Sequence, residues 1–380
     1  MNSLTFLKQL IPFPSVSCDS NADVSRWVEQ TLQSLGFTTE WLEYTDAEGV
    51  TKVCVSGQKG PATGRGLAYF CHTDVVPVSS WSFADSGPWE PLQTDSRLYG
   101  RGSCDMKGSL ACMLAAAKNT LNDTLTAPLS IVCTADEEIG LRGAAHVVGH
   151  SALYRSIVGC QSRAIIGEPT LLNVVHAHKG GRSMKVTSHG IAAHSSTGKG
   201  RNANFAMIPF LTAMHQLCQE IDGCSDYLDD RYDPPTINLN LGINDHTEAL
   251  NITPAQSVCT INFRTMPAVD TDALVQRIQD TAHQCGLTFE LMFGGNPVFT
   301  DPGSPFIREL LQLTGCQQSQ TVPYGTDGSC FTELSDIAVL GPGDIRQAHT
   351  DDEWISLEQM EQGTALYTRL IRQWCVDGKN

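Results

Sequence analysis

The sequence predicts an α/β protein with a mixed, largely parallel sheet and a second, inserted ferredoxin-like α+β domain. Towards both ends of the chain, short apolar runs alternate with amphipathic segments of helical length, which is typical of parallel strands joined by helices. The middle of the chain instead has the order β-α-β-β-α-β, a complete two-layer unit. The length of 380 residues is too great for one ordinary core and favours two domains.

The outer parts of the chain, residues 1–179 and 294–380, form the predicted α/β domain. Helical periodicity predicts helices over residues 3–11, 24–37, 105–121, 143–151 and 356–375. Gly36 is placed to end the second of them and Asp105 to cap the third. Short apolar runs predict strands over residues 66–72, 129–134, 163–169 and 336–343.

Residues 180–293 form the predicted inserted domain. Residues 182–190 alternate between apolar and polar side chains, as a half-buried strand does. Further strands and two helices complete the ferredoxin-like order, with strands at 236–244, 257–267 and 287–295 and helices at 202–221 and 270–286.

The charge balance restricts the classes of partner. The chain has 41 acidic and 25 basic residues and a formal net charge of −16. Nucleic acids and anionic membranes bind basic patches, so neither is expected as a partner. Such a chain suits cation binding, although an acidic surface that only keeps a protein soluble would have the same composition.

The cysteines and the N-terminus indicate the cellular compartment. The 14 cysteines are irregularly spaced and include no C-x-x-C pair, unlike a disulfide framework. The first residues lack the basic and long apolar regions of a secretory signal, and no apolar run approaches the ~20 residues of a membrane span. We therefore expect a cytoplasmic, reduced protein.

Histidine and carboxylate side chains follow the predicted strands where the strands end. Five segments of the chain supply them: His72 with Asp74, Asp105, Glu137 with Glu138, Glu168, and His349. In open α/β sheets, ligands bind beyond the carboxyl ends of the strands. We therefore expect these side chains to meet at one edge of one sheet.

Such a meeting of side chains predicts a metal centre. Imidazole nitrogen and carboxylate oxygen are ligands for Zn²⁺, Co²⁺ or Mn²⁺, and a dication would relieve the repulsion within the acidic triplet 136–138. Two histidines and three acids, with one acid shared, could hold a pair of ions about 3.5–4 Å apart. A further carboxylate would then accept a proton from an activated water.

Each residue alone has an ordinary structural explanation. Asp105 could be only a helix cap, Glu137 and Glu138 could lie in a solvated loop, and Glu168 before a proline is common turn chemistry. The metal hypothesis is favoured because these explanations must account for five coincidences at one edge.

The motifs around these residues resemble, in order and spacing, those of the metallopeptidase M20 family over nearly the whole chain. They are HTDVVP (72–77), GRGSCDMKG (100–108), TADEE (134–138), IGEPT (166–170), HKGG (178–181), GIAAHSS (190–196), NFRTMP (262–267) and GPGDIRQAH (341–349). The resemblance implies a metal-dependent amidohydrolase that acts on a small N-acyl amino acid. N2-acetyl-L-ornithine is the first expectation, which would place the chain in arginine biosynthesis. N-acetyl-L-citrulline and succinyl-diaminopimelate are the alternatives.

The resemblance also implies roles for the residues at the strand ends. His72 and Glu168 would bind one zinc, Glu138 and His349 the other, and Asp105 would bridge both. Glu137 would be the general base, and the Asp74 carboxylate would orient the His72 imidazole. The Asp105–Met106 peptide bond is expected to be cis.

Further roles are implied for the inserted domain, which in this family acts as a lid and a dimerisation domain. His194 would reach the active site of the partner subunit in a homodimer. Asn251 and Arg264 would hold the substrate. The Arg264 guanidinium would bind the α-carboxylate of the substrate. Gly325 and Thr326 would contact the substrate through the backbone and a hydroxyl.

Other classes of protein fit the sequence less well. Cys71 and His72 are adjacent on a strand and point to opposite faces, so they cannot act as nucleophile and base. The sequence has no G-x-S-x-G motif of a serine hydrolase. A non-catalytic metal-binding scaffold is harder to exclude, but it would not need Glu137 or His194.

Overall fold

A computed structural model describes residues 1–377, which form two compact units. The first unit comprises Met1–Ala177, Phe299–Gln320 and the described residues from Thr326 on, and the second comprises His178–Val298 and Thr321–Gly325. The short return 321–325 belongs to the second unit because Val322 accepts a hydrogen bond from the Lys179 amide (3.3 Å). The sequence-based division at residues 180 and 293 does not include this return.

The first unit is built on a nine-stranded mixed sheet, which confirms the predicted fold class. The strand order is β1-β2-β6-β3-β7-β15-β8-β13, with β14 paired to β8. β6, β3, β7 and β15 are parallel neighbours, whereas β1, β2 and β8 pair antiparallel. The strands are β1 (Thr38–Thr45), β2 (Thr51–Lys59), β3 (Leu67–His72), β6 (Leu129–Thr134), β7 (Arg163–Ile166), β8 (Val175–His178), β13 (Val298–Phe299), β14 (Gln320–Val322) and β15 (Ile337–Val339).

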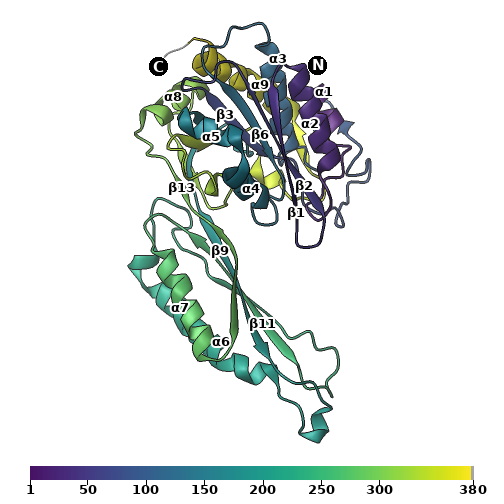
Figure 1. Ribbon diagram of the computed structural model, residues 1–380, viewed down its shortest axis with the longest axis vertical. Helices are drawn as coiled ribbons and strands as arrows, with labels where there is room; N and C mark the ends of the chain where they lie inside the picture. The colour runs from purple at the N-terminus through teal and green to yellow at the C-terminus, as the bar shows by residue number, and fades with distance from the viewer. Residues whose placement is uncertain (378–380) are drawn as a thin grey trace. The chain divides into compact units, whose positions relative to one another are not determined.

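Helices cover both faces of this sheet, so β3 and β6 are buried along their whole length. On one face, Tyr69 of β3 packs against Tyr367, with ring centroids 5.4 Å apart. On the other, Phe70 packs against Phe331 at 4.3 Å. The first face carries α1 (Ser3–Leu10), α2 (Ala22–Ser34), α3 (Lys107–Asn119) and α9 (Leu357–Ile371), with α8 (Pro305–Thr314) beside α9, and the second carries α4 (Arg142–His150) and α5 (Ala152–Gly159) (Figure 1).

A small three-stranded sheet lies in the same unit. It has the order β16-β5-β4 and consists of β16 (Trp354–Ser356), β5 (Arg97–Tyr99) and β4 (Leu92–Gln93). β5 and β16 are antiparallel, with Tyr99 opposite Trp354. The chain that leaves β5 runs through Asp105 into α3, and the chain that enters β16 comes from the segment of His349. This sheet therefore brings together two segments far apart in sequence.

The second unit has the predicted ferredoxin-like order. Its sheet runs β10-β11-β9-β12, all antiparallel, and two helices lie beside each other on one face of it (Figure 1). The elements are β9 (Gly180–His189), α6 (Ala203–Gly223), β10 (Asn240–Asn244), β11 (Gln256–Thr265), α7 (Thr271–Gln284) and β12 (Thr288–Gly295).

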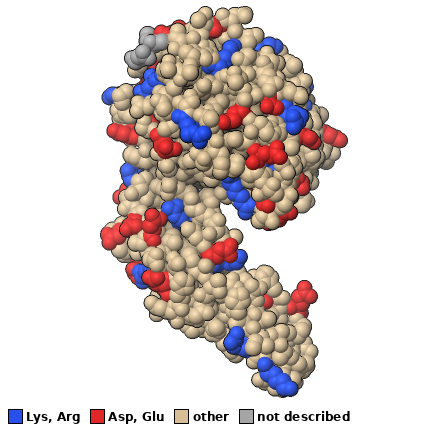
Figure 2. All heavy atoms as spheres, in the orientation of Figure 1, with Lys and Arg blue, Asp and Glu red and all other residues tan. Residues whose placement is uncertain are grey.

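The surface charge is mixed in sign despite the net charge of −16. Acidic and basic side chains are interspersed over the face seen in Figure 2. Within residues 1–377, none of the helices combines the length and the apolar character that a membrane span requires.

Candidate metal centre

Three neighbouring parallel strands deliver the first site residues to one edge of the sheet. His72 is the last residue of β3, Glu137 and Glu138 follow the end of β6, and Glu168 follows the end of β7. Because β6, β3 and β7 are adjacent and parallel, their carboxyl ends lie side by side. The expected convergence at a sheet edge is thus present in the fold.

Two groups of candidate metal ligands lie at this edge. His72, Asp105 and Glu168 form one group, and Asp105, Glu138 and His349 form the other, with ligand atoms within 4.8 Å of one another in each. The two oxygens of Asp105 divide between the groups: Oδ1 lies 3.2 Å from His72 Nε2, and Oδ2 lies 3.3 Å from His349 Nε2. One carboxylate therefore faces both groups.

The remaining contacts complete each group. His72 Nε2 lies 3.6 Å from Glu168 Oε1, and His349 Nε2 lies 3.0 Å from Glu138 Oε2. The His72 side chain is only 1% exposed and that of His349 is 55% exposed. The first group is therefore buried, and the second opens to solvent through His349.

The expected helix-capping role of Asp105 is wrong. The residue before α3 in the capping position is Met106, which makes no side-chain capping bond. The Asp105 carboxylate is turned instead towards His72 and His349, where it has stronger partners than the amides of the first helical turn. The Asp105–Met106 peptide bond is cis, as the resemblance implied.

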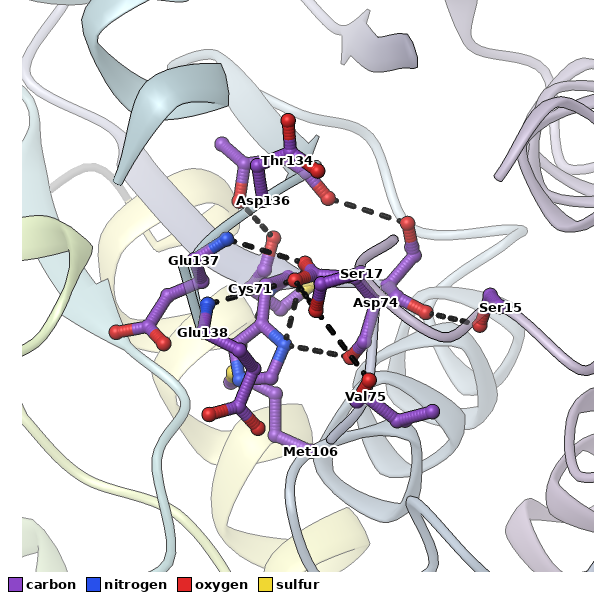
Figure 3. A network of polar contacts seen from close by, with 12 residues as sticks. Ser15, Ser17, Cys71, Asp74, Val75, Met106, Thr134, Asp136, Glu137 and Glu138 are labelled. Carbon is purple, nitrogen blue, oxygen red and sulfur yellow. Dashed lines mark hydrogen bonds and ion pairs between the residues drawn. The ribbon is translucent and has the colours of Figure 1, made fainter. Parts of the chain in front are cut away.

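Asp74 lies behind the site, but its carboxylate has different partners from those expected. His72 Nδ1 donates to the Asp74 backbone carbonyl at 2.9 Å, whereas the carboxylate Oδ1 is 3.7 Å away. The carboxylate accepts the backbone N–H groups of Glu137 (3.3 Å) and Glu138 (3.4 Å) and the Ser17 hydroxyl (2.7 Å). Figure 3 shows both amides facing Asp74 while both glutamate side chains point the other way.

The three carboxylates of the acidic triplet 136–138 point in two directions. Asp136 adopts a left-handed conformation with φ of 55°, and its carboxylate points away from the ligand groups. It lies 3.1 Å from the buried Lys52 ammonium and accepts the Tyr44 hydroxyl at 2.8 Å. Only Glu137 and Glu138 of the triplet are therefore left facing the candidate centre.

Burial and like charge disturb the titration of the glutamates. Burial, reinforced by the charge of Asp105, raises the pKa of Glu138 above its usual value and that of Glu168 well above it. Burial also raises the pKa of Glu137 well above its usual value, with Glu168 adding to the effect. The protein itself supplies too little positive charge here for all of these groups.

The pKa values of both histidines are raised, whereas burial alone lowers the pKa of an imidazole. Burial lowers the pKa of His72, but the hydrogen bond to Asp105 and the charge of Glu168 outweigh it, so this pKa lies well above its usual value. Hydrogen bonds to Asp105 and Glu138 raise the pKa of His349 to about 10. Both shifts favour the imidazolium forms, whose positive charge would partly offset the charge of the acids.

The candidate substrate residues lie mostly in the second unit. His194 is exposed, its Nδ1 is 2.7 Å from Ser196 Oγ, and its segment pairs with that of the exposed Asn251, whose carbonyl accepts the Ser195 amide at 2.9 Å. Arg264 is half-buried near Gly325, where an added Cβ would lie 3.9 Å from Arg264 Nη1. Thr326, in the first unit, is buried and accepts the Gly328 amide at 3.0 Å.

Several charged or hydroxyl-bearing residues around the site were not predicted from the sequence. They are Tyr44, Lys52, Arg101, Asp327 and Glu353. Asp327 accepts the Thr134 hydroxyl, its Oδ1 has no hydrogen-bond partner among the described residues, and burial raises its pKa to about 7. Lys52 and Tyr44 lie on the unpredicted hairpin β1–β2, far from Asp136 in sequence. Their only sequence signal is a single charge or hydroxyl in a strand-like segment.

The fold and the site together define a hydrolase with a candidate metal centre at the carboxyl edge of an α/β sheet. Residues 68–373 match the model of peptidase family M20/M25/M40. The chain belongs to this family, whose enzymes are metal-dependent hydrolases.

Curated relatives cover almost the whole chain. The chain is 32% identical over 382 residues to acetylornithine deacetylase of Myxococcus xanthus, covering 97% of this chain and 96% of the relative. It is 30% identical over 390 residues to acetylornithine deacetylase of Proteus mirabilis, covering 98% and 96%.

Solved structures of lower identity share the fold. A di-peptidase of Saccharomyces cerevisiae superposes with a TM-score of 0.75 at 14% identity, covering 98% of this chain and 96% of that one. An M20 family metallo-carboxypeptidase of Sulfolobus solfataricus superposes with a TM-score of 0.73 at 17% identity, covering 98% and 99%.

The donor set fits divalent metal ions. Two imidazole nitrogens and three carboxylates suit Zn²⁺, Co²⁺ and Mn²⁺, and the raised pKa values of Glu138 and Glu168 indicate a site that lacks positive charge. His72, Asp105 and Glu168 would hold one ion, and Asp105, Glu138 and His349 a second.

We predict that metal binding at pH 7 releases protons. The pKa of His349 is raised to about 10 and that of His72 lies well above its usual value, which favours imidazolium in the metal-free protein. Each imidazolium must lose the proton of its coordinating nitrogen to bind a cation. Calorimetric titration of metal-free protein with Zn²⁺ in buffers of different ionisation enthalpy measures the number released. We expect at least one proton per protein molecule, and a value of zero would contradict the arrangement.

Proposed function

We propose that this chain is a di-zinc deacetylase that removes the acetyl group from N2-acetyl-L-ornithine to give L-ornithine and acetate, a step of arginine biosynthesis. The observation that carries the proposal is the Asp105 carboxylate, whose two oxygens face one ligand group each. The names of the curated relatives support the substrate. Co²⁺ or Mn²⁺ could replace Zn²⁺ with the same ligands.

The residues of the centre divide the chemistry among them. A pair of bound ions supplies Lewis acidity to the amide carbonyl and lowers the pKa of a water molecule. Glu137 belongs to neither ligand group, and its raised pKa suits a carboxylate that accepts a proton near neutral pH. It would take the proton of the attacking water and return it to the nitrogen of the leaving amine.

Asp74 positions a candidate ligand and the proposed base. Asp74 fixes the tautomer of His72, because His72 Nδ1 donates to its carbonyl and leaves Nε2 free to bind a cation. Its carboxylate holds the amides of Glu137 and Glu138 and so fixes the base next to a ligand.

The substrate itself would be held mainly by the second unit. The planar guanidinium of Arg264 suits both oxygens of an α-carboxylate, and Asn251 can donate or accept a hydrogen bond. Gly325 and Thr326 would complete the contacts through the backbone and a hydroxyl. The half-burial of Arg264 beside Gly325 supports a shared role for these two residues.

Three alternatives remain distinct from the main proposal. N-acetyl-L-citrulline carries a neutral ureido group where acetylornithine carries an ammonium, and succinyl-diaminopimelate carries a longer, acidic acyl group. A non-catalytic metal-binding scaffold would retain the ligands but would not need the half-buried Glu137 beside them.

The proposed activity predicts metal-dependent hydrolysis of acetylornithine. Metal-free protein should be inactive and should recover on addition of Zn²⁺ or Co²⁺, because the ions supply the Lewis acidity. Steady-state rates for N2-acetyl-L-ornithine, N-acetyl-L-citrulline and succinyl-diaminopimelate should be compared side by side, and the first should have the highest kcat/KM. A higher value for either alternative would change the substrate, and full activity without metal would end the proposal.

Separate roles for Glu137 and Glu138 can be tested by matched amide variants. Glu137→Gln should lower kcat by a factor of roughly 10²–10⁴, since it removes a general base, and should leave metal content nearly unchanged. Glu138→Gln should lower the occupancy of one metal, because an amide is a poorer ligand than a carboxylate. Elemental analysis and kinetics on both variants distinguish the roles, and the reverse pattern would mean that they are exchanged.

We further propose that the protein is a homodimer formed through the second unit. A groove of about 310 Å³ lies between α6 and the edge strand β10 and is lined by Met207, Ile208, Leu211 and Ile243, among other residues. Phe205 beside it is 72% exposed and Ile243 is 62% exposed. A second copy of the chain would cover this apolar surface in an isologous interface. In such a dimer His194 of each chain would stabilise the charge on the carbonyl oxygen in the other.

The dimer proposal predicts complementation between two inactive variants. Glu137→Gln and His194→Ala are mixed under conditions that exchange subunits, so that each heterodimer contains one site with both residues intact. With equal mixing and random pairing, activity should recover towards about a quarter of the wild-type value. Exchange demonstrated by labelled subunits, with no recovery of activity, would refute the role of His194.

We propose a cytoplasmic location because the cysteine thiols are free. All 14 cysteines lie within the described residues and are free, which fits a reducing compartment.

A further inference from the structure

The three-stranded sheet β16-β5-β4 connects the segments of two candidate metal ligands. Antiparallel pairing of β5 with β16 places Tyr99 opposite Trp354. The Gly100 amide extends this ladder by donating to the Glu353 carbonyl at 3.0 Å. Asp105 follows β5 by a short loop, and His349 precedes β16 by a similarly short one. Glu353 is therefore the point at which the two loops meet.

The Glu353 carboxylate accepts four hydrogen bonds from the Asp105 loop. Oε1 accepts the backbone N–H groups of Cys104 (2.8 Å) and Asp105 (2.9 Å). Oε2 accepts the backbone N–H of Gly102 (2.8 Å) and Nη1 of Arg101 (2.9 Å). Three of the four donors are main-chain groups, so the carboxylate fixes the path of the backbone up to Asp105 itself.

Both charged members of this arrangement are buried. The side chains of Glu353 and Arg101 are each 1% exposed, and the guanidinium of Arg101 lies 5.7 Å from the centre of the Trp81 ring. A buried carboxylate that accepts four hydrogen bonds has no competing interaction with water, and its geometry is narrowly defined. Among the described residues, no hydrogen bond or ion pair joins the Glu353 carboxylate to a ligand side chain, and its hydrogen bond to Asp105 is to the backbone amide.

We propose that Glu353 is a positioning residue that sets the separation of Asp105 and His349 and thereby the affinity of the second metal site. The inference rests on the proposed metal centre. His72 and Glu168 are fixed by β3 and β7 of the large sheet, and the first group therefore keeps two ligands without Glu353. The second group contains Asp105 and His349 together, whose loops are joined by the Glu353 carboxylate.

An amide cannot replace this carboxylate. In Glu353→Gln, one oxygen becomes an NH₂ group that can only donate. Placed at Oε1, it would face the amides of Cys104 and Asp105, and placed at Oε2 it would face Gly102 and Arg101. Neither rotamer satisfies all four donors, so the loop before Asp105 must move although the side chain keeps its size.

The test measures metal binding and does not depend on the substrate. Metal-free wild-type protein and Glu353→Gln are titrated with Zn²⁺ by calorimetry, with Mn²⁺ as a second probe, and binding is resolved into two steps. We expect one step to keep its wild-type affinity and the other to lose about 10–100-fold, as for other groups that hold metal ligands in place. Thermal unfolding of the metal-free forms shows whether the variant is folded.

Two further variants keep the test decisive. Arg101→Met removes one donor and leaves the three amides bound to Glu353, so it should weaken the same step by about tenfold, the lower end of that range. It decides the question if Glu353→Gln does not fold. Glu40 is the matched control, because its carboxylate accepts the Ala152 amide at 2.8 Å at the start of α5 and contacts neither ligand group. Glu40→Gln should leave both steps unchanged.

The outcomes separate this inference from the function on which it rests. Wild-type protein that binds no ion would overturn the metal centre itself. Normal binding by wild type with two unchanged steps in the folded variants would overturn only the role of Glu353. Equal weakening of both steps would also overturn it, because that pattern indicates general loosening of the first unit.

Discussion

Six carboxyl groups of the Asp105 loop and of the segments that follow β3, β6 and β7 lie at the carboxyl edge of these strands, and their mutual repulsion is the constraint that the rest of the site must meet. They are Asp74, Asp105, Asp136, Glu137, Glu138 and Glu168. Asp136 is removed from the group by its left-handed backbone and by its ion pair with Lys52. Asp74 is stabilised by two amides and a hydroxyl. The other four depend on the imidazoles of His72 and His349, or on cations in their place, which is why the arrangement favours metal binding over a purely structural role.

Backbone amides bound to buried carboxylates give this site its geometry. Asp74 holds the amides of Glu137 and Glu138, and Glu353 holds those of Gly102, Cys104 and Asp105. In both cases an acid that is no candidate ligand fixes a stretch of main chain that includes one candidate ligand, Glu138 or Asp105. Such a carboxylate adds negative charge close to the centre, but it replaces the flexibility of a loop by a defined path. A ligand on a loop can then be placed nearly as accurately as one at the end of a strand.

The sequence predicted those parts of the structure in which the signal is local. β3, β6 and β7 are short apolar runs that end on His, Glu or a Gly-Glu-Pro turn, so strand ends and candidate ligands were visible together. The hairpin β1–β2 was missed because β1 is mostly half-exposed and has no clear alternation of apolar residues. The capping role expected for Asp105 was wrong because local sequence shows only an acid before a helix, whereas the imidazoles of His72 and His349 that face its carboxylate are brought near by the fold. Lys52 and Glu353 could not be found at all, since each acts on partners that only the folded chain brings near.

The division into two units also separates two kinds of chemistry. All five candidate ligands and Glu137 belong to the first unit, whereas His194, Asn251, Arg264 and Gly325 belong to the second. The ligands are tied to strand ends and to buried carboxylates, so substitutions there disturb a network of partners. Among the residues of the second unit, His194 and Asn251 are exposed and Arg264 is half-buried. Substitutions at these positions can therefore have less effect on stability. Solved structures named as a dipeptidase and a carboxypeptidase share the fold at 14–17% identity. Under the proposed function, the choice among acyl amino acids would have to be sought in the second unit and not in the ligand set.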